Sequence, residues 1–236
     1  MKSLSERVRE DEVMDSPDLD VGLHHQALAA LRRVNLWSGI GGRLAGTLAD
    51  LAKQRGLSRL RVLDLASGGG DVSLSLVRSM QRRGVAVELD GWDRSETAVD
   101  YATAQAKRRG QSGVRFLVRD VLNDPVEEAY DVVLSTLFLH HLENSDATRL
   151  LQKMRAAAGQ AVLVDDLLRT RTGYWLAQAG TRLLTFSPVV HVDGPMSVRA
   201  AFSLAEVHQL ADQAELTGAT VRTHWPSRFL LCWQRP

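Results

Sequence analysis

A short apolar run that leads into three consecutive glycines constrains this chain most. The run, Arg61–Leu65, carries an acid, Asp64, near its end, and Gly68–Gly70 follow. A strand, a glycine turn and a helix in this order are how α/β proteins hold a nucleotide, because glycine lets the backbone approach the ligand and the helix N-terminus offers free N–H groups. Taken alone, the three glycines also fit an ordinary turn. The helix is indicated by an apolar stripe at Val72, Leu76, Val77 and Met80.

Strands and helices alternate regularly after this motif. Strands are expected at residues 61–66, 85–93, 114–120, 130–137 and 160–167, and helices at 71–83, 95–109 and 145–158. Helices of about 12 to 15 residues between strands imply right-handed crossovers and a mostly parallel sheet. Two further strands, at 219–225 and 228–234, flank a two-residue turn and must be antiparallel neighbours. The sequence therefore predicts an α/β fold whose parallel sheet ends in an antiparallel hairpin.

The segment before this motif is helical. Residues 1–20 are charged and indicate an arm or a short helix. Residues 20–56 carry a helical stripe, which the glycines within residues 35–42 should divide into two helices. We expect residues 1–56 to form an N-terminal helical cap and residues 57–236 to form the main domain.

An irregular segment follows the fifth expected strand. Residues 172–185 are predicted to form an additional helix, and residues 187–198, which hold two prolines, a loop. We expect residues 170–200 to be an inserted lid. Ser203 and Glu206 then have the spacing of a capping box, which predicts the start of the last helix.

Composition is compatible with an enzyme and indicates no nucleic-acid or membrane partner. Of 236 residues, 29 are basic and 28 acidic, and this balance favours neither nucleic acid nor an anionic membrane. The N-terminus has no apolar leader, and no stretch approaches the roughly 18 apolar residues of a membrane span, so we expect a cytoplasmic protein. A single cysteine excludes internal disulfides, and the scattered histidines show no metal-ligand spacing, so no metal is expected. The oligomeric state stays open, with a homodimer among the alternatives.

Two acids mark the ends of the next two expected strands. Asp93 ends the second strand, where a carboxylate can accept both hydroxyls of a ribose. Asp120 ends the third, where a carboxylate can accept the exocyclic amine of adenine, with Val121 against the ring. The plainer interpretation is that each acid only caps a turn, Asp93 with Ser95.

The glycine turn favours one class of nucleotide over others. A nicotinamide-dinucleotide site needs glycine or alanine at the third motif position, where this chain has Ser73. An acid such as Asp64 is also unfavourable beside a pyrophosphate, and the P-loop pattern is absent from the sequence. A sulfonium cofactor with an amino-acid tail carries no phosphate, and its positive charges suit Asp64.

Four motifs in order resemble those of class I S-adenosylmethionine-dependent methyltransferases, and the likeness covers roughly residues 58–236. That family has a Rossmann-like, seven-stranded, mostly parallel sheet with an antiparallel last strand and helices on both faces. The resemblance implies the same fold, the same activity and S-adenosylmethionine as cofactor. The motifs are Val62–Asp71, Gly91–Ser95, Arg119–Val121 and Asp131–Leu142.

The resemblance also assigns roles by position. Asp64 would serve the methionine amine through water, Asp93 would hold the ribose and Asp120 the adenine. Ala66 departs from the family, which usually has its first glycine there, and alanine should cost little if its φ is negative. The cofactor-binding residues expected on this basis are Asp64, Ala66, Ser67, Gly68, Gly70, Asp93, Arg94, Asp120, Val121, Ser135 and Thr136.

Methyl transfer to a hydroxyl needs alignment, exclusion of water and a base. His140 and His141 follow the fourth expected strand, beside the methionine end, and a histidine of near-neutral pKa suits proton removal. His191 and Asp193 form a second candidate pair of base and orienting carboxylate. The alternative is that one of the paired histidines only packs at the end of the strand.

The acceptor is expected to be a small molecule. Residues 167–198 are rich in Leu, Trp and Phe and, with the N-terminal helices, would enclose an apolar site. Residues 14–19 and 193–199 are similar to methyltransferases that accompany bacterial type III polyketide synthases, which implies a role in secondary metabolism and O-methylation of an aromatic or phenolic acceptor. A quinone-ring C-methyltransferase is the nearest alternative. An NAD-dependent oxidoreductase and a cofactor-binding module without activity are alternatives from other classes.

Overall fold

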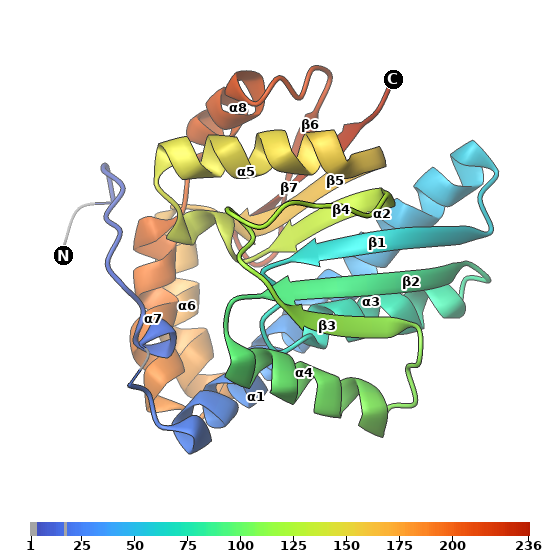
Figure 1. Ribbon diagram of the computed structural model, residues 1–236. Helices are drawn as coiled ribbons and strands as arrows, with labels where there is room; N and C mark the ends of the chain where they lie inside the picture. Colours follow the sequence, from blue (N-terminus) through green and yellow to red (C-terminus); the bar gives the residue numbers. More distant parts are fainter. Residues whose placement is uncertain (1–3, 17) are drawn as a thin grey trace.

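The computed structural model describes residues 4–16 and 18–236 and centres on one seven-stranded sheet (Figure 1). The strands lie in the order β3-β2-β1-β4-β5-β7-β6. The first five are parallel, whereas β7 runs antiparallel to both of its neighbours, which confirms the predicted α/β, Rossmann-like sheet. The strands are β1 Arg59–Leu65, β2 Ala86–Asp93, β3 Val114–Val118, β4 Tyr130–Thr136, β5 Ala158–Leu167, β6 Thr220–His224 and β7 Arg228–Gln234.

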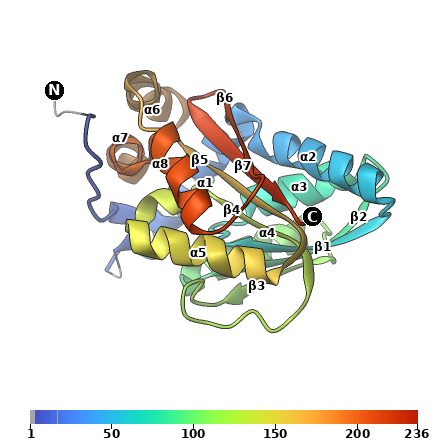
Figure 2. The same cartoon turned by 90° about the horizontal axis from the view of Figure 1, so that it is seen from above.

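Helices cover both faces of the sheet, as predicted (Figure 2). α2, α3 and α4 pack on one face and α5 and α8 on the other, each layer with its own buried apolar core. None of the described helices has the length and hydropathy needed to cross a membrane. The helices are α1 Val21–Ser38, α2 Ile40–Arg55, α3 Asp71–Gln81, α4 Glu96–Arg108, α5 Asn144–Ala157, α6 Arg171–Leu184, α7 Pro188–Ala200 and α8 Leu204–Gln213, with single turns η1 Val13–Asp15 and η2 Leu139–His141.

Local sequence signals set several helix ends where they were predicted. Ser95 caps α4 by accepting the N–H of Ala98. Ser203 and Glu206 form the predicted capping box at α8. Gly39, with a φ of +69°, separates α1 from α2 and confirms the expected division of the N-terminal helical region.

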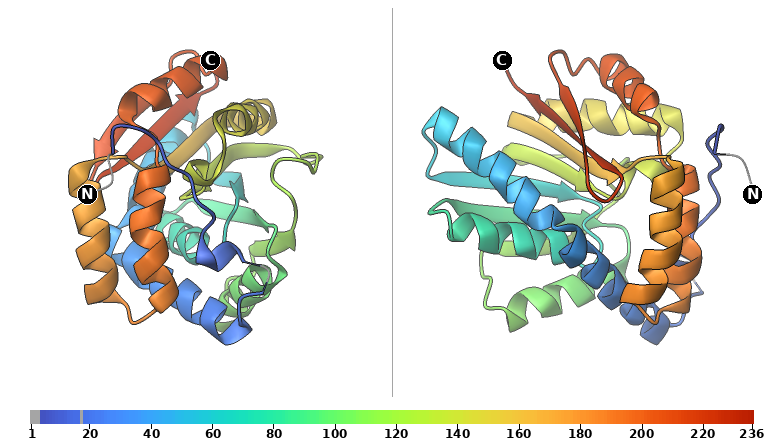
Figure 3. Two further views of the ribbon diagram at one scale, coloured as in Figure 1. Left: turned by 90° about the vertical axis from the view of Figure 1, so that its left-hand side faces the viewer. Right: turned by 180° about the vertical axis from the view of Figure 1, so that it is seen from behind.

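Residues 187–198 form most of helix α7, and the prediction of a loop there was wrong. Prolines break a helix only where position and packing do not compensate. Pro188 occupies the first turn, where its missing N–H has no partner to lose. Pro195 lies in the interior, where packing must offset that loss. α7 lies so close beside α6 that a Cβ on Gly194 would come within 2.6 Å of Thr181 (Figure 3).

The N-terminal residues 4–16, here called the strap, cross the carboxyl ends of the strands beside α7 (Figure 3). Arg7 donates hydrogen bonds to the backbone carbonyls of His140, at 2.8 Å, and Ala200, at 2.6 Å. Asp193 on α7 accepts two backbone N–H groups of the strap, at 2.9 and 3.0 Å. The strap is therefore attached both to the sheet side and to the α6–α7 pair.

Candidate active site

A cavity of about 920 Å³ lies at the carboxyl ends of the parallel strands, the edge at which open α/β sheets bind ligands. The glycine turn after β1, the end of β2, the loop after β3, the η2 turn and the strap form its wall. The predicted site residues in this lining are Ala66, Ser67, Gly68, Asp93, Arg94, Asp120, Val121, Thr136, His140 and His141.

The backbone of the glycine turn leaves no room for larger residues at its end. Gly70 has a φ of +71°, and a Cβ there would lie 2.5 Å from the ring of Phe116. The same ring would meet a Cβ on Gly91 at 2.5 Å, so two glycines make space for one aromatic side chain. Ala66 has a φ of +60°, which does not meet the expectation of a negative φ. This alanine is therefore strained, by about 1–2 kcal/mol.

Asp93 presents a largely buried carboxylate to the cavity. Its Oδ2 accepts the N–H of Gly68 at 2.8 Å, and its Oδ1 accepts the N–H of Ser95 at 2.9 Å. Burial raises the pKa of Asp93, although these two hydrogen bonds oppose the shift. Because each carboxylate oxygen has a second acceptor site, Asp93 caps the turn and can still accept two hydroxyl groups.

Asp64 and Ser135 are buried and do not line the cavity. One oxygen of Asp64 accepts the hydroxyl of Ser73, and the other, Oδ1, has no hydrogen-bond partner among the described residues. Burial raises the pKa of Asp64 to about 7. The hydroxyl of Ser135 donates to the carbonyl of Leu65 at 2.9 Å and so joins β4 to β1. Both side chains thus support the glycine turn from within the protein.

Asp120 lines the cavity, but its carboxylate also caps a turn. Oδ1 accepts the N–H groups of Leu122, at 2.8 Å, and Asn123, at 3.1 Å, and Oδ2 accepts the side-chain amide of Asn123 at 2.8 Å. Burial alone would raise the pKa of Asp120, but these hydrogen bonds have the larger effect, so the pKa of Asp120 is lowered. Of the four acceptor sites of a carboxylate, one remains for a ligand.

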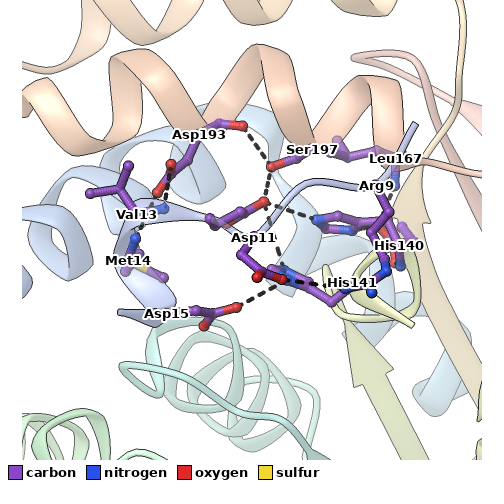
Figure 4. Close-up of polar contacts among 12 residues, drawn as sticks. Arg9, Asp11, Val13, Met14, Asp15, His140, His141, Leu167, Asp193 and Ser197 are labelled. Atoms are coloured by element: carbon purple, nitrogen blue, oxygen red, sulfur yellow. Dashed lines mark hydrogen bonds and ion pairs between the residues drawn. The ribbon is translucent and has the colours of Figure 1, made fainter. Parts of the chain in front are cut away.

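Two histidines of η2 meet the strap at the end of the cavity (Figure 4). Nδ1 of His140 lies 2.6 Å from the buried carboxylate of Asp166 on β5, and Nδ1 of His141 lies 3.3 Å from Asp15 on the strap. Glu12, also on the strap, has its Oε1 3.7 Å from Nε2 of His140 and 3.9 Å from Nε2 of His141. Ligand atoms of Glu12 and the two histidines all lie within 4.8 Å of one another.

The carboxylates set the charge of this cluster. Burial alone would lower the pKa of His140, but Asp166 and Glu12 outweigh it and raise that pKa to about 10. Burial alone would raise the pKa of Glu12. The two histidines and the Ser197 hydroxyl have the larger combined effect, so the pKa of Glu12 lies below its usual value. The two carboxylates therefore favour the protonated form of the His140 imidazole, whereas the sequence led us to expect an imidazole of near-neutral pKa.

A second cavity, of about 160 Å³, adjoins the first at η2. Glu12, Leu137, His140 and His141 line both cavities. The rest of its wall comes mainly from α1, α6 and α7 and is largely apolar. These apolar lining residues include Val34, Leu167, Leu176, Ala177, Leu184, Val190 and Val198.

His191 lies outside the linings of both cavities. Its Nε2 lies 3.0 Å from the carbonyl oxygen of Thr185. Asp193 accepts hydrogen bonds from the strap instead of orienting that histidine. The structure therefore does not bring His191 and Asp193 together as a base and its partner.

Residues 62–159 match the family described as a methyltransferase domain. This stretch begins in β1 and reaches the start of β5, so it contains the glycine turn, Asp93, Asp120 and η2. This stretch is therefore similar to a methyltransferase domain. S-Adenosylmethionine is the cofactor of this class. No curated protein matches the chain.

Solved methyltransferase structures share the fold of the whole chain. The plantazolicin methyltransferase with bound S-adenosylhomocysteine is 15% identical, with a TM-score of 0.66, over 93% of this chain and 90% of that one. Magnesium protoporphyrin IX methyltransferase from Synechocystis, with S-adenosylhomocysteine, is 18% identical, with a TM-score of 0.59, over 86% and 87%. Human N-acetylserotonin methyltransferase, with S-adenosylmethionine, is 17% identical, with a TM-score of 0.65, over 92% and 56%. This chain spans only 58% of the length of a further structurally similar protein, from Nostoc punctiforme. These likenesses show the class I methyltransferase fold.

Sequence reasoning missed three acids of this candidate site. Glu12 and Asp15 lie on the strap, and no local pattern indicates that the strap reaches η2. Asp166 lies near the end of β5, and an acid at the carboxyl end of a parallel strand is the one signal that could have identified it.

Proposed function

We propose that this protein transfers a methyl group from S-adenosylmethionine to the oxygen of a small aromatic or phenolic acceptor. The observation that carries the proposal is the junction of two unlike cavities at His140 and His141. The larger cavity is lined by the glycine turn and acids, and the smaller by apolar side chains. A methyl group carried in the first can therefore be presented to an atom held in the second.

The larger cavity suits a cofactor with a ribose and positive charges. Asp93 is free to accept two ribose hydroxyls, Val121 offers an apolar surface to the adenine, and Asp120 keeps one acceptor site. Glu12 and Asp15 border the same cavity. Acidic surroundings favour a sulfonium and an ammonium group over the phosphates of a dinucleotide. The wall of the cavity therefore supports S-adenosylmethionine rather than NAD.

The smaller cavity suits one ring of the acceptor. An apolar cavity of about 150 Å³ is enough to hold a benzene molecule, and this one measures about 160 Å³. A phenol placed here would have its ring among the apolar side chains of α1, α6 and α7 and its hydroxyl toward η2. A quinone-type ring has a similar size, so C-methylation is the competing outcome of the test below.

Transfer of the methyl group is an in-line displacement, so the protein must mainly align the reactants and exclude water. The bond between the acceptor oxygen and the methyl carbon forms as the carbon–sulfur bond breaks, and the hydroxyl proton must leave. We propose that His140 and His141, which line both cavities, contact this hydroxyl. His191 lies outside both cavities and does not take this role.

Two measurements test the proposal. Calorimetry should detect S-adenosylhomocysteine binding at micromolar concentrations and no comparable binding of NAD, and the reverse result would refute the donor assignment. Protein incubated with methyl-labelled donor and an extract of its own cells should then yield a labelled aryl methyl ether. A label on a ring carbon would instead support C-methylation. Donor binding without any labelled product would support a binding module without activity.

A further inference from the structure

Glu12, His140 and His141 bring one carboxylate and two imidazoles together where the two cavities meet. We propose that they bind a divalent transition-metal ion through Oε1 of Glu12 and Nε2 of both histidines. Two imidazoles and one carboxylate, with further positions open, are the donor set of catalytic zinc sites and of non-haem iron sites. Nitrogen donors also make this set a poor one for magnesium or calcium, which prefer oxygen.

Each histidine is already oriented for this role by a second carboxylate. Nδ1 of His140 is 2.6 Å from Asp166, which also accepts the backbone N–H of His140 at 3.1 Å. Nδ1 of His141 is 3.3 Å from Asp15. A hydrogen on each Nδ1 leaves the Nε2 lone pair free on the side of Glu12. Metal-binding histidines almost always donate their second ring N–H in this way, and here each Nδ1 has a carboxylate within 3.3 Å that can accept it.

The separations between Glu12 and the two histidines require only a small contraction, and the ligand atoms of all three residues lie within 4.8 Å of one another. Oε1 of Glu12 lies 3.7 Å from Nε2 of His140 and 3.9 Å from Nε2 of His141. Ligand atoms about 2.0–2.1 Å from a tetrahedral ion lie about 3.3–3.4 Å apart. Closing the gap takes a few tenths of an ångström. Glu12 belongs to the strap rather than to a strand, so it can make this movement.

The charges around the cluster also favour a cation. Once a metal ion has displaced the proton from Nε2 of His140, the carboxylates of Glu12, Asp15 and Asp166 contribute three negative charges. Arg94, whose guanidinium lies 3.6 Å from Asp15, offsets one of them. A divalent ion would offset the remaining two. Since the side chains of Glu12 and Asp166 are 10% and 1% exposed, solvent compensates little of this charge.

The role of the ion rests on the proposed function. An open coordination position at the junction of the cavities would take the hydroxyl oxygen of the acceptor. Coordination would release the hydroxyl proton to water and leave a metal-bound oxygen anion. That oxygen then forms its bond to the methyl carbon while the carbon–sulfur bond breaks, which leaves a neutral thioether. No group changes its oxidation state.

Metal binding can be tested without an acceptor. Tag-free full-length protein is stripped with a chelator and titrated with Zn²⁺ by calorimetry and with Co²⁺ by visible absorption. We expect one equivalent of each ion to bind and Co²⁺ to show the d–d bands of a nitrogen- and oxygen-coordinated ion. Glu12→Gln and Asp166→Asn should weaken Zn²⁺ binding at least 10-fold. His208→Ala, an exposed histidine of α8, is the matched control and should bind Zn²⁺ as the unmodified protein does.

Binding of S-adenosylhomocysteine, measured on the same preparations, separates this proposal from the proposed function. Weak Zn²⁺ binding by Glu12→Gln together with unchanged S-adenosylhomocysteine binding would support the metal site. If the unmodified protein binds S-adenosylhomocysteine but no Zn²⁺, the metal site is wrong and the donor assignment stands. Equal Zn²⁺ binding by the unmodified protein, Glu12→Gln and His141→Ala would also overturn it. Thermal melting followed by circular dichroism shows whether each variant is folded.

Discussion

Replacing Gly70 with alanine should lower the free energy of unfolding by about 2–4 kcal/mol, and the structure separates this loss into two parts. A non-glycine residue at a φ of +71° destabilises the folded protein by about 1–2 kcal/mol. Alanine also lowers the conformational entropy of the unfolded chain, which offsets about 0.4–1 kcal/mol of this loss. The new Cβ would also lie 2.5 Å from Cζ of Phe116 and 2.9 Å from Cβ of Ala102. Overpacking of this kind costs about 1–3 kcal/mol.

Gly68 provides the control, because it has a φ of +51° but no atom within 4 Å of the position that a Cβ would take. Gly68→Ala should therefore show only the backbone part, a net loss of about 0.5–1 kcal/mol. Ala66→Gly is the reverse change at a φ of +60° and should stabilise by a similar amount. Urea unfolding of the ligand-free proteins measures all three. Equal destabilisation by Gly70→Ala and Gly68→Ala would refute the steric argument, as would failure of Phe116→Leu to relieve Gly70→Ala.

Three further predictions concern other parts of the molecule. Asp93→Ala should weaken S-adenosylhomocysteine binding by about 2 kcal/mol, or about 30-fold in Kd, because two charge-assisted hydrogen bonds to the ribose are lost; an unchanged Kd by calorimetry would place the ribose elsewhere. Burial would raise the pKa of Glu206, but Arg169 and Ser203 outweigh it and lower the pKa to about 2. Because the pKa of Glu206 is lower in the folded than in the unfolded protein, its ionisation stabilises the folded state above about pH 4.5, and this contribution is lost as the pH falls toward 2. The urea midpoints of the unmodified protein and of Glu206→Gln should therefore converge as the pH is lowered. Midpoints that stay equally far apart at every pH would contradict the assignment. Hydrogen exchange in the strap and in residues 170–200 should slow when S-adenosylhomocysteine and an acceptor are bound together, and equal exchange in free and bound protein would show that these segments are not a lid.

The sheet and its glycine turn could be predicted because local patterns determine them. Apolar runs of strand length, the glycines after β1 and the capping residues Ser95 and Ser203 each act within a few residues of the chain. The α7 helix could not be predicted in this way. Pro195 opposes a helix locally, and the packing of Gly194 against Thr181, which lies on a separate helix, cannot be recognised from a local pattern.

The residues of the candidate site likewise divide into those that a local pattern predicts and those that only tertiary folding brings together. Asp93, Asp120 and the paired histidines follow strand ends, and the parallel sheet brings such ends to one edge. Glu12 belongs to a segment that no periodic pattern connects to the sheet, so its distance from His140 is a result of tertiary folding. The φ of Ala66 is likewise a conformational fact that residue identity alone does not reveal.

The hydrogen bond between Arg7 and the carbonyl of Ala200 joins positions 193 residues apart in the chain. The strap leaves the ribosome well before α7, to which it is hydrogen-bonded. Because domains fold as their segments emerge, the glycine turn and its neighbouring acids can be in place while the strap still lacks its partners on α7. The larger cavity therefore gains its complete outer wall only after α7 has been synthesised, and a chain truncated before α7 would leave that wall incomplete.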